Sequence, residues 1–471
     1  MVRHPPTFGT DGMRGRAGTE LTPELVLSLG RAFARVQRPE CCAVGRDTRL
    51  SGTMLQAAFQ AGMCSEGVEV VDLGVMPTPG VAWLSGEMGC AAAVVSASHN
   101  PFFDNGIKLF GVGGVKLPDE LEREVEAELG RLTKRSGGQR GRGVGQDGVD
   151  AGAGPRSGDR SWPRDQPGVV TVDLEAAGRY AEHLAGILEP GCLSGLKIVL
   201  DTANGATVRL APSVLRQLGA EIVVIAASPD GRNINDRCGS THPEAMVEAV
   251  LAHGADVGLA FDGDGDRLIA SDANGRLVNG DEMLAILAGD LSARGLLARS
   301  CVAVTVMTNL GFHQAMAGRG IKVLQTDVGD RYVLEAMEKE GLVLGGEQSG
   351  HIVQRHLAGT GDGILTGLSL LGVMLRSGRS LGDLAGDSMQ RFPQEMVNVP
   401  VRDPSSIDGA GPVWATVEEL HAELDGQGRV LLRASGTEKV VRVMVEASSA
   451  RLAKEMADRL ARVVAAELEE A

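Results

Sequence analysis

Three aspartates alternate with glycines over Asp262–Asp266, and Arg267 follows them directly. Carboxylates at every second position can turn toward one small, hard cation, and the glycines let the backbone curl tightly around it. The apolar run 255–261 predicts a buried strand, which puts the aspartates at a strand's carboxyl end, where ligands bind in open α/β sheets. Oxygen-only ligands favour Mg²⁺. We therefore predict a divalent-metal site in which Arg267 neutralises charge or holds a phosphate.

Other acidic loops fit this segment less well. An EF-hand requires glycine at the sixth loop position and glutamate at the twelfth, where this chain has Arg267 and Ala273. A haloacid-type phosphatase carries its nucleophilic aspartate after an early strand, whereas this cluster lies past the middle of the chain. A solvated acidic turn stays open as the alternative, although such turns rarely follow so apolar a strand.

A second polar segment follows the small-residue strand 91–95 and contains Ser96, Ser98 and His99. An exposed hydroxyl in such an elbow can act as a nucleophile or carry a phosphate. We disfavour a Ser98–His99 catalytic pair, because sequence neighbours seldom point at each other and the glycines of a nucleophile elbow are missing. A turn held by side-chain hydrogen bonds is the structural alternative. Asp104–Lys108 follows and supplies a lysine.

Two further segments combine small residues with groups that bind polar ligands. Glycines flank Glu347–Ser349 and precede His351, a mixture that suits recognition of sugar hydroxyls but is also common loop material. The segment Arg433–Glu438, with Arg442 close behind it, could cradle a phosphate dianion; a salt-bridged turn is the alternative.

The elements that must position these loops repeat a strand–polar loop–helix–strand pattern near 42–71, 197–225 and 302–324. Such units imply mixed or parallel sheets covered by helices. The C-terminal part differs: strands at 430–433 and 440–446 precede a helix at 450–469 and predict a small α+β domain. Between 134 and 168 the chain is rich in Gly, Arg, Asp and Ser, which predicts a flexible insertion.

Length and charge narrow the class of protein. A chain of 471 residues exceeds one hydrophobic core, and its net charge of −15 argues against nucleic acid or an anionic membrane as a partner. We find no stretch of transmembrane length and no signal-peptide core, so the cytoplasm is the expected location. The 7 cysteines have no metal-binding spacing and are expected to be reduced thiols.

Taken together and in this order, the loops resemble those of the α-D-phosphohexomutase superfamily along essentially the whole chain. The matching pieces include Phe8–Gly15 and Thr326–Val333 besides the loops above. The resemblance implies four domains around a central cleft, three related α/β domains with mixed sheets and a smaller C-terminal α+β domain. The expected boundaries are 1–170, 171–277, 278–385 and 386–471.

The resemblance also implies roles for individual residues. Ser98 resembles the serine that is phosphorylated in the active enzymes, and it would complete a metal shell formed by Asp262, Asp264 and Asp266. Candidates for proton transfer or charge stabilisation are Arg14, His99, Lys108, Arg267 and His351. Candidates for substrate binding are Glu347, Ser349, Arg433, Ser435, Gly436, Thr437 and Arg442.

Within the superfamily, Gln348 and the Val328–Val333 run resemble the subfamily that interconverts glucosamine 6-phosphate and glucosamine 1-phosphate and supplies UDP-N-acetylglucosamine for cell-wall synthesis. The alternative is a phosphomannomutase/phosphoglucomutase; a metal-dependent phosphatase and a non-catalytic sugar-phosphate sensor are more distant ones. The implied cofactors are one Mg²⁺ per subunit, the phosphoserine, and a hexosamine 1,6-bisphosphate as activator and intermediate. A homodimer and a kinase acting on Ser98 stay open. Lys439, which stands where relatives often have proline, and the insertion 134–168 depart from the family pattern.

Overall fold

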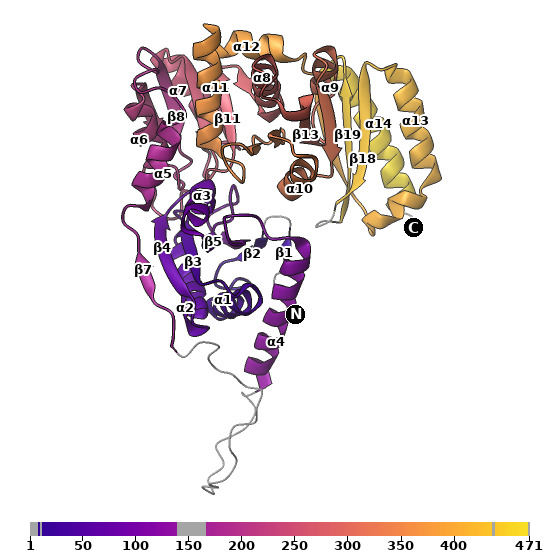
Figure 1. The fold of residues 1–471 in the computed structure, drawn as a ribbon. Helices are drawn as coiled ribbons and strands as arrows, with labels where there is room; N and C mark the ends of the chain where they lie inside the picture. Colours follow the sequence, from indigo (N-terminus) through magenta and orange to yellow (C-terminus); the bar gives the residue numbers. More distant parts are fainter. Residues whose placement is uncertain (1–7, 10–11, 139–165, 436–438, 470–471) are drawn as a thin grey trace, which may run out of the picture. The chain divides into compact units, whose positions relative to one another are not determined.

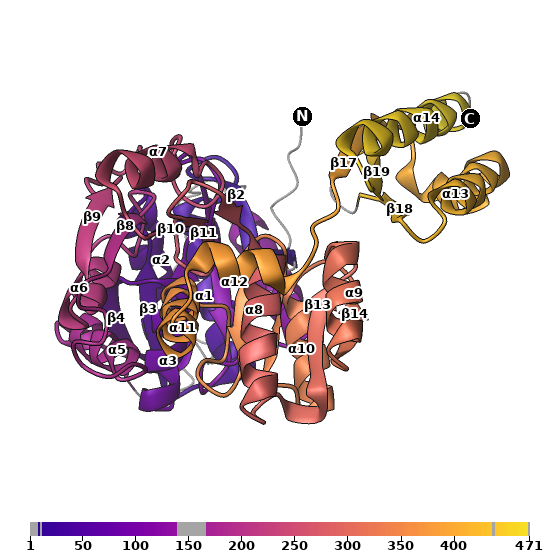
Figure 2. The same ribbon diagram turned by 90° about the horizontal axis from the view of Figure 1, so that it is seen from above.

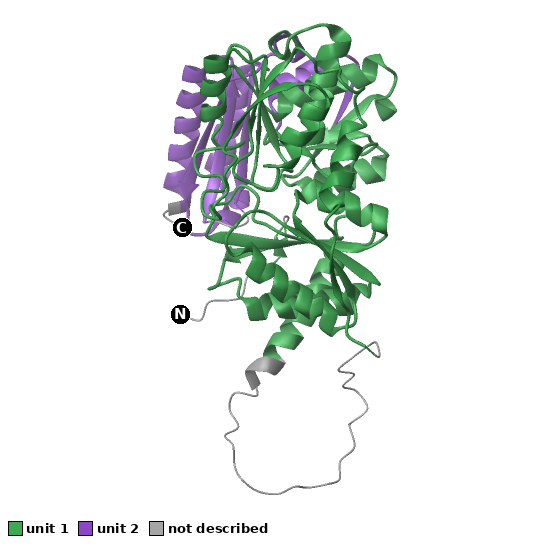
Figure 3. Cartoon of the chain, turned by 90° about the vertical axis from the view of Figure 1, so that its left-hand side faces the viewer, with its two compact units in different colours: residues 1–306, 324–385 green, residues 307–323, 386–471 purple. Residues whose placement is uncertain are grey.

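The computed structural model describes residues 8–9, 12–138, 166–435 and 439–469 (Figure 1). The chain forms two compact units, Met1–Val306 with Leu324–Ala385, and Met307–Val323 with Gly386–Ala471 (Figure 3). The first unit contains all of the predicted catalytic and metal-binding residues. The second unit contains the predicted phosphate-binding arginines.

The first sheet has seven strands in the order β1-β2-β6-β5-β3-β4-β7. Strand β3 is parallel to β4 and β5, whereas β6 is antiparallel to β5 and β2. The strands are β1 Phe8–Gly9, β2 Gly12–Arg16, β3 Cys41–Arg46, β4 Glu69–Val75, β5 Ala91–Val95, β6 Asp104–Phe110 and β7 Val170–Val172. The helices are α1 Pro23–Gln37, α2 Gly52–Ser65, α3 Thr78–Met88 and α4 Asp119–Gly138.

Helices cover both faces of this sheet, as the alternation of side chains along β3 shows. Cys42 and Val44 join the apolar cluster formed with α1, α2 and α4. Gly45 lies on the opposite face, where an added Cβ would lie 2.4 Å from Val81 of α3. The carboxyl ends of β3, β4 and β5 are thus held rigidly at one edge of the sheet, and the loops that follow them start from there.

The second sheet has the order β12-β11-β10-β8-β9. Its elements are α5 Ala176–Ala185, β8 Lys197–Asp201, α6 Leu210–Gln217, β9 Glu221–Ile225, α7 Glu244–His253, β10 Val257–Phe261, β11 Leu268–Asp272 and β12 Leu277–Val278 (Figure 2). Strand β10 is central and fully buried. Its Gly258 packs against Met246 and Val250 of α7, and its Leu259 packs against Gly367 of α11 (Gly363–Ser377). Burial on both faces explains the unbroken apolar run that precedes the aspartates.

The third sheet has the order β14-β13-β15-β16. Its strands are β13 Cys301–Thr305, β14 Lys322–Thr326, β15 Leu344–Gly346 and β16 Ile352–Gln354. The accompanying helices are α8 Gly280–Ala293, α10 Asp330–Glu340, α11 Gly363–Ser377 and α12 Leu381–Ser388. Helix α8 begins with a capping box in which Asn279 and Glu282 satisfy each other's backbone amides.

The second unit contains a three-stranded sheet in the order β17-β19-β18. Its elements are α9 Leu310–Gly318, β17 Gln394–Pro400, α13 Gly411–Leu424, β18 Gly428–Ala434, β19 Val440–Ala447 and α14 Ala450–Glu469. Glu446, fully buried in β19, accepts the Leu310 N–H at 2.9 Å and pairs with Arg429 at 2.8 Å. These bonds attach α9 to the C-terminal sheet.

Most sequence predictions of secondary structure are confirmed to within a residue or two, including the expected helix at 450–469. Three points differ. Cys41 and Cys90 form a disulfide between the first residue of β3 and the residue before β5, so the expectation of reduced thiols is wrong for this pair. Helix α4 continues to Gly138, past the expected start of the insertion, and residues 139–165 lie outside the described residues. Strand β7 pairs with β4, so the first sheet continues past residue 170, where the first domain was expected to end.

None of the helices in the described ranges is long and apolar enough to cross a membrane.

Candidate active site

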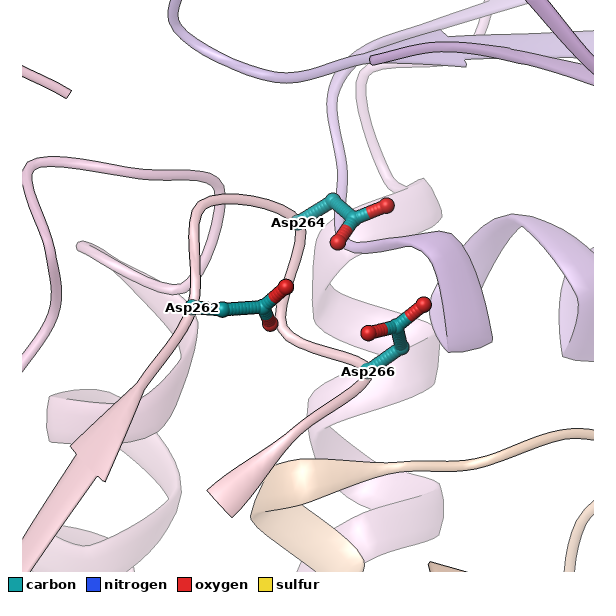
Figure 4. A group of neighbouring side chains, drawn as sticks. All are labelled: Asp262, Asp264 and Asp266. Atoms are coloured by element: carbon teal, nitrogen blue, oxygen red, sulfur yellow. The ribbon is translucent and has the colours of Figure 1, made fainter. Parts of the chain in front are cut away.

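The three aspartates occupy the turn between β10 and β11, and all three are buried (Figure 4). One oxygen from each lies within 4.8 Å of the others. Asp264 Oδ1 and Asp266 Oδ1 have no hydrogen-bond partner in the part of the chain that the structure describes. Buried carboxylate oxygens without donors are costly unless a cation binds them. The donor set therefore fits a small, hard divalent cation.

The glycines between the aspartates allow close backbone contact. An added Cβ on Gly263 would lie 2.6 Å from the Ser98 carbonyl oxygen, and Gly265 has a φ of +75° that L-residues rarely adopt. We call 262–266 the metal loop and 96–103 the serine loop. Their backbones thus lie in direct contact at Gly263, where any larger residue would push them apart.

Ser98 follows β5 and meets the metal loop directly. Its hydroxyl donates a hydrogen bond to Asp262 Oδ2 at 2.5 Å. The side chain is not exposed as expected: Ser98 is only 1% exposed. Ser98 Oγ also lies 3.2 Å from His99 Nδ1, so the expectation that these neighbours point apart is wrong. A left-handed backbone at Ser98, with φ +52°, makes this geometry possible.

Lys108 and Thr78 hold the other side of the metal loop. Lys108 stands on β6 opposite Val94 of β5, and its Nζ lies 2.8 Å from Asp264 Oδ2 and 2.9 Å from Asp266 Oδ2. The Thr78 hydroxyl donates to the same Asp264 oxygen at 2.7 Å, and its N–H donates to the Asp264 carbonyl at 2.9 Å. Thr78 was not predicted from the sequence. Its only signal is its place just after the carboxyl end of β4.

Burial and neighbouring charges shift the pKa values of individual groups in the site in different directions. Burial, together with Asp266 and Asp264, raises the pKa of Asp262 well above its usual range. Burial also opposes ionisation of Asp266, but Lys108 and His351 outweigh it and hold its pKa well below the usual range. Burial, with Arg267 and Arg14 nearby, lowers the pKa of His99 to about 4, so its imidazole is neutral near pH 7.

His351 lies between two acidic groups. Its Nδ1 is 3.8 Å from Asp266 Oδ1, and its Nε2 is 4.0 Å from Asp330 Oδ2. Although burial opposes it, Asp266 raises the pKa of His351 to about 9. Asp330 in turn pairs with Lys116 at 2.6 Å. Asp330 lies in the segment Thr326–Val333 that resembles the family, but no role for it was predicted from the sequence.

The segment Glu347–His351, which is predicted to bind the sugar, is hydrogen-bonded through its backbone to the strand β11 that follows the aspartates. Leu268 N–H donates to the Gly350 carbonyl at 3.1 Å, and an added Cβ on Gly350 would lie 1.9 Å from Leu268 O. Ser349 Oγ lies 3.4 Å from Glu347 Oε2, and Gly329 N–H donates to Glu347 Oε1 at 3.1 Å. These contacts hold Glu347 and Ser349 in one conformation.

The two arginines of the first unit occupy different elements. Arg14 is part of β2 and pairs in register with Gly106 of β6. The Arg267 N–H donates to Asp262 Oδ1 at 3.2 Å, and its Nε lies 3.9 Å from Asp266 Oδ1. Arg267 therefore contacts two of the three aspartates, where a positive charge can offset part of theirs.

In the second unit, Arg433 of β18 and Arg442 of β19 are direct cross-strand partners. Ser435 N–H donates to the Val440 carbonyl at 3.0 Å, which closes the turn between the strands. Two guanidinium groups on one face of a sheet are a charge pattern that suits a phosphate dianion. The predicted ligands Gly436 and Thr437 lie outside the described residues.

Comparison with known proteins identifies the family. Models of the four domains of phosphoglucomutase/phosphomannomutase match in order: domain I over residues 5–136, domain II over 178–275, domain III over 279–392 and the C-terminal domain over 396–463. The chain is 49% identical to the phosphoglucosamine mutase of Desulforudis audaxviator, over 97% of both chains. It is 48% identical to the phosphoglucosamine mutase of Streptomyces griseus, over 97% of this chain and 98% of that one.

Solved structures agree in fold. A phosphoglucomutase/phosphomannomutase family protein from Burkholderia thailandensis has a TM-score of 0.77 at 25% identity, covering 98% of this chain and 97% of that one. An Aspergillus fumigatus N-acetylphosphoglucosamine mutase, solved with GlcNAc-6P and magnesium, has a TM-score of 0.68 at 18% identity over 98% and 96% of the two chains. The chain belongs to the α-D-phosphohexomutases, with the four-domain fold of that superfamily. Within them it belongs to the phosphoglucosamine mutase family, whose members are isomerases.

Replacing Thr78 by valine should weaken divalent-metal binding. The change keeps a similar shape but removes the hydroxyl that orients Asp264, and loss of such a supporting hydrogen bond typically costs about 10-fold to 100-fold in metal affinity. Isothermal titration with Mg²⁺ measures the effect. Thr78→Ser, which keeps the hydroxyl, should bind within about threefold of the unaltered protein; equal affinity in both variants contradicts the assignment.

Proposed function

We propose that this phosphoglucosamine mutase carries its transferable phosphoryl group on Ser98 and passes it to either end of glucosamine phosphate through a 1,6-bisphosphate. The observation that carries the proposal is the 2.5 Å contact between Ser98 Oγ and Asp262, one of three clustered aspartates. A phosphoserine in this position would lie beside a site suited to a divalent cation. The serine and the acidic loop belong to different domains, so local turn chemistry does not account for their meeting.

The cation that fits the aspartates best is Mg²⁺, because every donor is an oxygen. Asp262, Asp264 and Asp266 would hold it together with an oxygen of the Ser98 phosphate. A bound Mg²⁺ would draw charge from the phosphoryl oxygens and so favour their transfer.

Lys108 and His351 are the candidates for proton transfer on the substrate side. Lys108 is held by two of the carboxylates that would bind the cation, so metal binding competes for the oxygens that now stabilise its ammonium form. A lysine released in this way can accept the proton of the attacking hydroxyl. His99 lies against Ser98 Oγ and Arg267 beside Asp266, where they can support the serine oxygen and the transferred charge.

The proposed reaction consists of two phosphoryl transfers, and the bisphosphate turns round in the site between them. The anomeric oxygen of glucosamine 6-phosphate forms a bond to phosphorus, the bond from phosphorus to Ser98 Oγ breaks, and one proton moves from the sugar hydroxyl to the enzyme. The resulting 1,6-bisphosphate turns over; Ser98 Oγ forms a bond to the phosphorus at position 6, the bond from that phosphorus to O6 breaks, and the proton returns from the enzyme to O6, which releases glucosamine 1-phosphate. The same groups serve both half-reactions.

The remaining predicted residues would bind the parts of the substrate that do not react. Arg433 and Arg442, with Ser435, Gly436 and Thr437, would hold the distal phosphate. Glu347 and Ser349 would bind sugar substituents, and Glu347 can pair with the 2-ammonium group that distinguishes glucosamine from glucose and mannose. Arg14 would add positive charge for a phosphate.

Burial of Ser98 favours one way of loading the enzyme. Ser98 is 1% exposed and hydrogen-bonded to Asp262, so a small sugar bisphosphate would need less opening of the loop to reach it than a protein would. A protein kinase would need to withdraw the whole loop. We therefore propose a hexosamine 1,6-bisphosphate as the activator. A cytoplasmic location and a homodimer remain predictions from the sequence.

Ser98→Ala should abolish isomerisation, because it removes the hydroxyl that is proposed to carry the phosphate. We expect a loss in kcat of more than about 10⁴-fold with the thermal midpoint nearly unchanged. A coupled assay and intact-protein mass spectrometry after incubation with glucosamine 1,6-bisphosphate measure activity and phosphate loading. Ser28→Ala, on α1, is the control and should keep both.

Full activity of the alanine variant would refute the serine assignment. If the unaltered protein releases inorganic phosphate without isomerising the sugar, it is a phosphatase. If the unaltered protein binds the bisphosphate without becoming phosphorylated, it is a sensor.

Arg442→Ala should weaken substrate binding, since it removes a charged donor to the distal phosphate. The expected loss is about 1.5–3 kcal/mol, seen mainly as an increase in KM for glucosamine 6-phosphate. Lys454→Ala removes a positive charge from α14 of the same unit and should leave KM unchanged. An unaltered KM in the Arg442 variant contradicts the proposal that Arg442 binds the distal phosphate.

Turnover on competing sugars should favour glucosamine 6-phosphate over mannose 6-phosphate and glucose 6-phosphate by about tenfold or more in kcat/KM. Glu347→Gln removes the charge that would pair with the 2-ammonium group and should reduce this preference. Coupled assays on the three sugars measure it. A faster reaction with mannose or glucose phosphate would support the phosphomannomutase/phosphoglucomutase alternative.

A further inference from the structure

Arg49 is a buried arginine that neither the sequence motifs nor the mechanism above uses. It lies in the loop after β3, and its side chain is fully buried. The Nε atom donates to Asp47 Oδ2 at 2.8 Å. A guanidinium buried this completely must place its donors on fixed acceptors, because an unmatched charge in the interior is strongly unfavourable.

Those acceptors are the backbone of the serine loop. Nη2 donates to the carbonyl oxygens of Ser98 and Asn100, both at 2.8 Å. Nη1 donates to the Asp104 carbonyl at 3.1 Å and also to the Pro101 carbonyl. One side chain thus binds three carbonyl oxygens of the segment that joins β5 to β6 and a fourth at the first residue of β6.

Asp47 secures the same loop from the other side of Arg49. Its Oδ1 accepts the Arg49 N–H at 2.9 Å, and its Oδ2 accepts the Ser96 hydroxyl at 2.6 Å. The Ser96 oxygen in turn accepts the Ser98 N–H at 2.9 Å. The N–H and the carbonyl of Ser98 are therefore both held by groups that lead back to the Asp47–Arg49 pair.

A second donor comes from the neighbouring domain. Asn235 Nδ2 donates to the Ser98 carbonyl at 2.9 Å and to the Asn100 carbonyl at 3.1 Å. These are the two oxygens that Arg49 Nη2 also contacts. Arg49 and Asn235, which belong to different domains, therefore stabilise the same backbone conformation of the serine loop.

This conformation needs support. Ser98 has a φ of +52°, in the left-handed region that a serine adopts at a cost. The same arrangement engages the Ser98 and Asn100 carbonyls, whose negative dipole ends would otherwise be free to face a phosphate or to compete for a cation.

We propose that Arg49 is a positioning residue for phosphoryl transfer, one that fixes the serine loop so that Ser98 Oγ stays aimed at the acidic cluster. The inference rests on the proposed function, in which Ser98 carries the phosphate. Only a planar fork of five donors matches this set of acceptors; lysine offers a point charge with three.

The test is Arg49→Lys, which keeps the charge and loses the fork. Misplacement of the serine should lower kcat by about 100-fold and slow phosphate loading by glucosamine 1,6-bisphosphate in parallel. The KM for glucosamine 6-phosphate and the affinity for Mg²⁺ should stay within about twofold. Arg46→Lys is the matched control, because Arg46 ends β3 nearby and its side chain makes one hydrogen bond within the described residues, at 3.3 Å to the Asp47 carbonyl; it should retain kcat.

A double-mutant cycle with Asn235→Ala gives a second measurement that does not require the Arg49 variant to be fully stable. Because both residues bind the Ser98 and Asn100 carbonyls, their effects on kcat should be non-additive, with the double variant losing less than the product of the single losses. Strictly multiplicative losses would overturn the inference, as would a kcat in Arg49→Lys equal to that of Arg46→Lys.

Hydrogen exchange of the amides at 98–104 separates this inference from the proposed function. Faster exchange in Arg49→Lys than in Arg46→Lys, with reduced kcat, supports positioning. Unchanged exchange overturns it even if Ser98 carries the phosphate. If Ser98→Ala retains full activity, the proposed function fails whatever the exchange of the loop shows.

Discussion

The acidic cluster is the constraint on which the first unit depends. Three buried carboxylates within 4.8 Å of one another repel strongly, and the loop that carries them cannot compensate for this alone. The compensation comes from elsewhere in the sequence: Lys108 from β6, the Thr78 hydroxyl from α3, and the Ser98 hydroxyl that follows β5. The electrostatics of one turn therefore require the first two domains to meet there.

Bare backbone makes this meeting close enough. Gly263 lies against the Ser98 carbonyl, and Gly350 lies against the carbonyl of Leu268, in both cases nearer than any Cβ allows. A side chain at either position would push apart loops whose polar groups must stay within hydrogen-bond distance. The abundance of glycine in the chain is, at these two positions, a condition for the site rather than a sign of flexibility.

Local patterns explain why the sequence predicts the elements well and the contacts less well. The apolar run into Phe261 is a property of β10 alone, and the Asp-Gly alternation is visible without a fold. Thr78, by contrast, meets Asp264 across 186 positions, and no local pattern marks it. The Cys41–Cys90 disulfide depends on β3 and β5 being neighbours in the sheet, which the repeat pattern does not specify. The contact of Ser98 with His99 depends on a left-handed φ that serine rarely adopts.

The second unit contributes a different kind of chemistry. Arg433 and Arg442 are direct cross-strand partners on β18 and β19, so their side chains leave the C-terminal sheet on the same face. Two guanidinium groups on one face suit a phosphate dianion, which carries the same charge whether carbon 1 or carbon 6 of a sugar bears it. The proposed function needs a property of this kind, because the serine must likewise exchange a phosphoryl group with either carbon. Recognition by charge alone cannot tell one hexose phosphate from another, so under that proposal the choice of sugar is left to groups such as Glu347 that would contact the ring substituents.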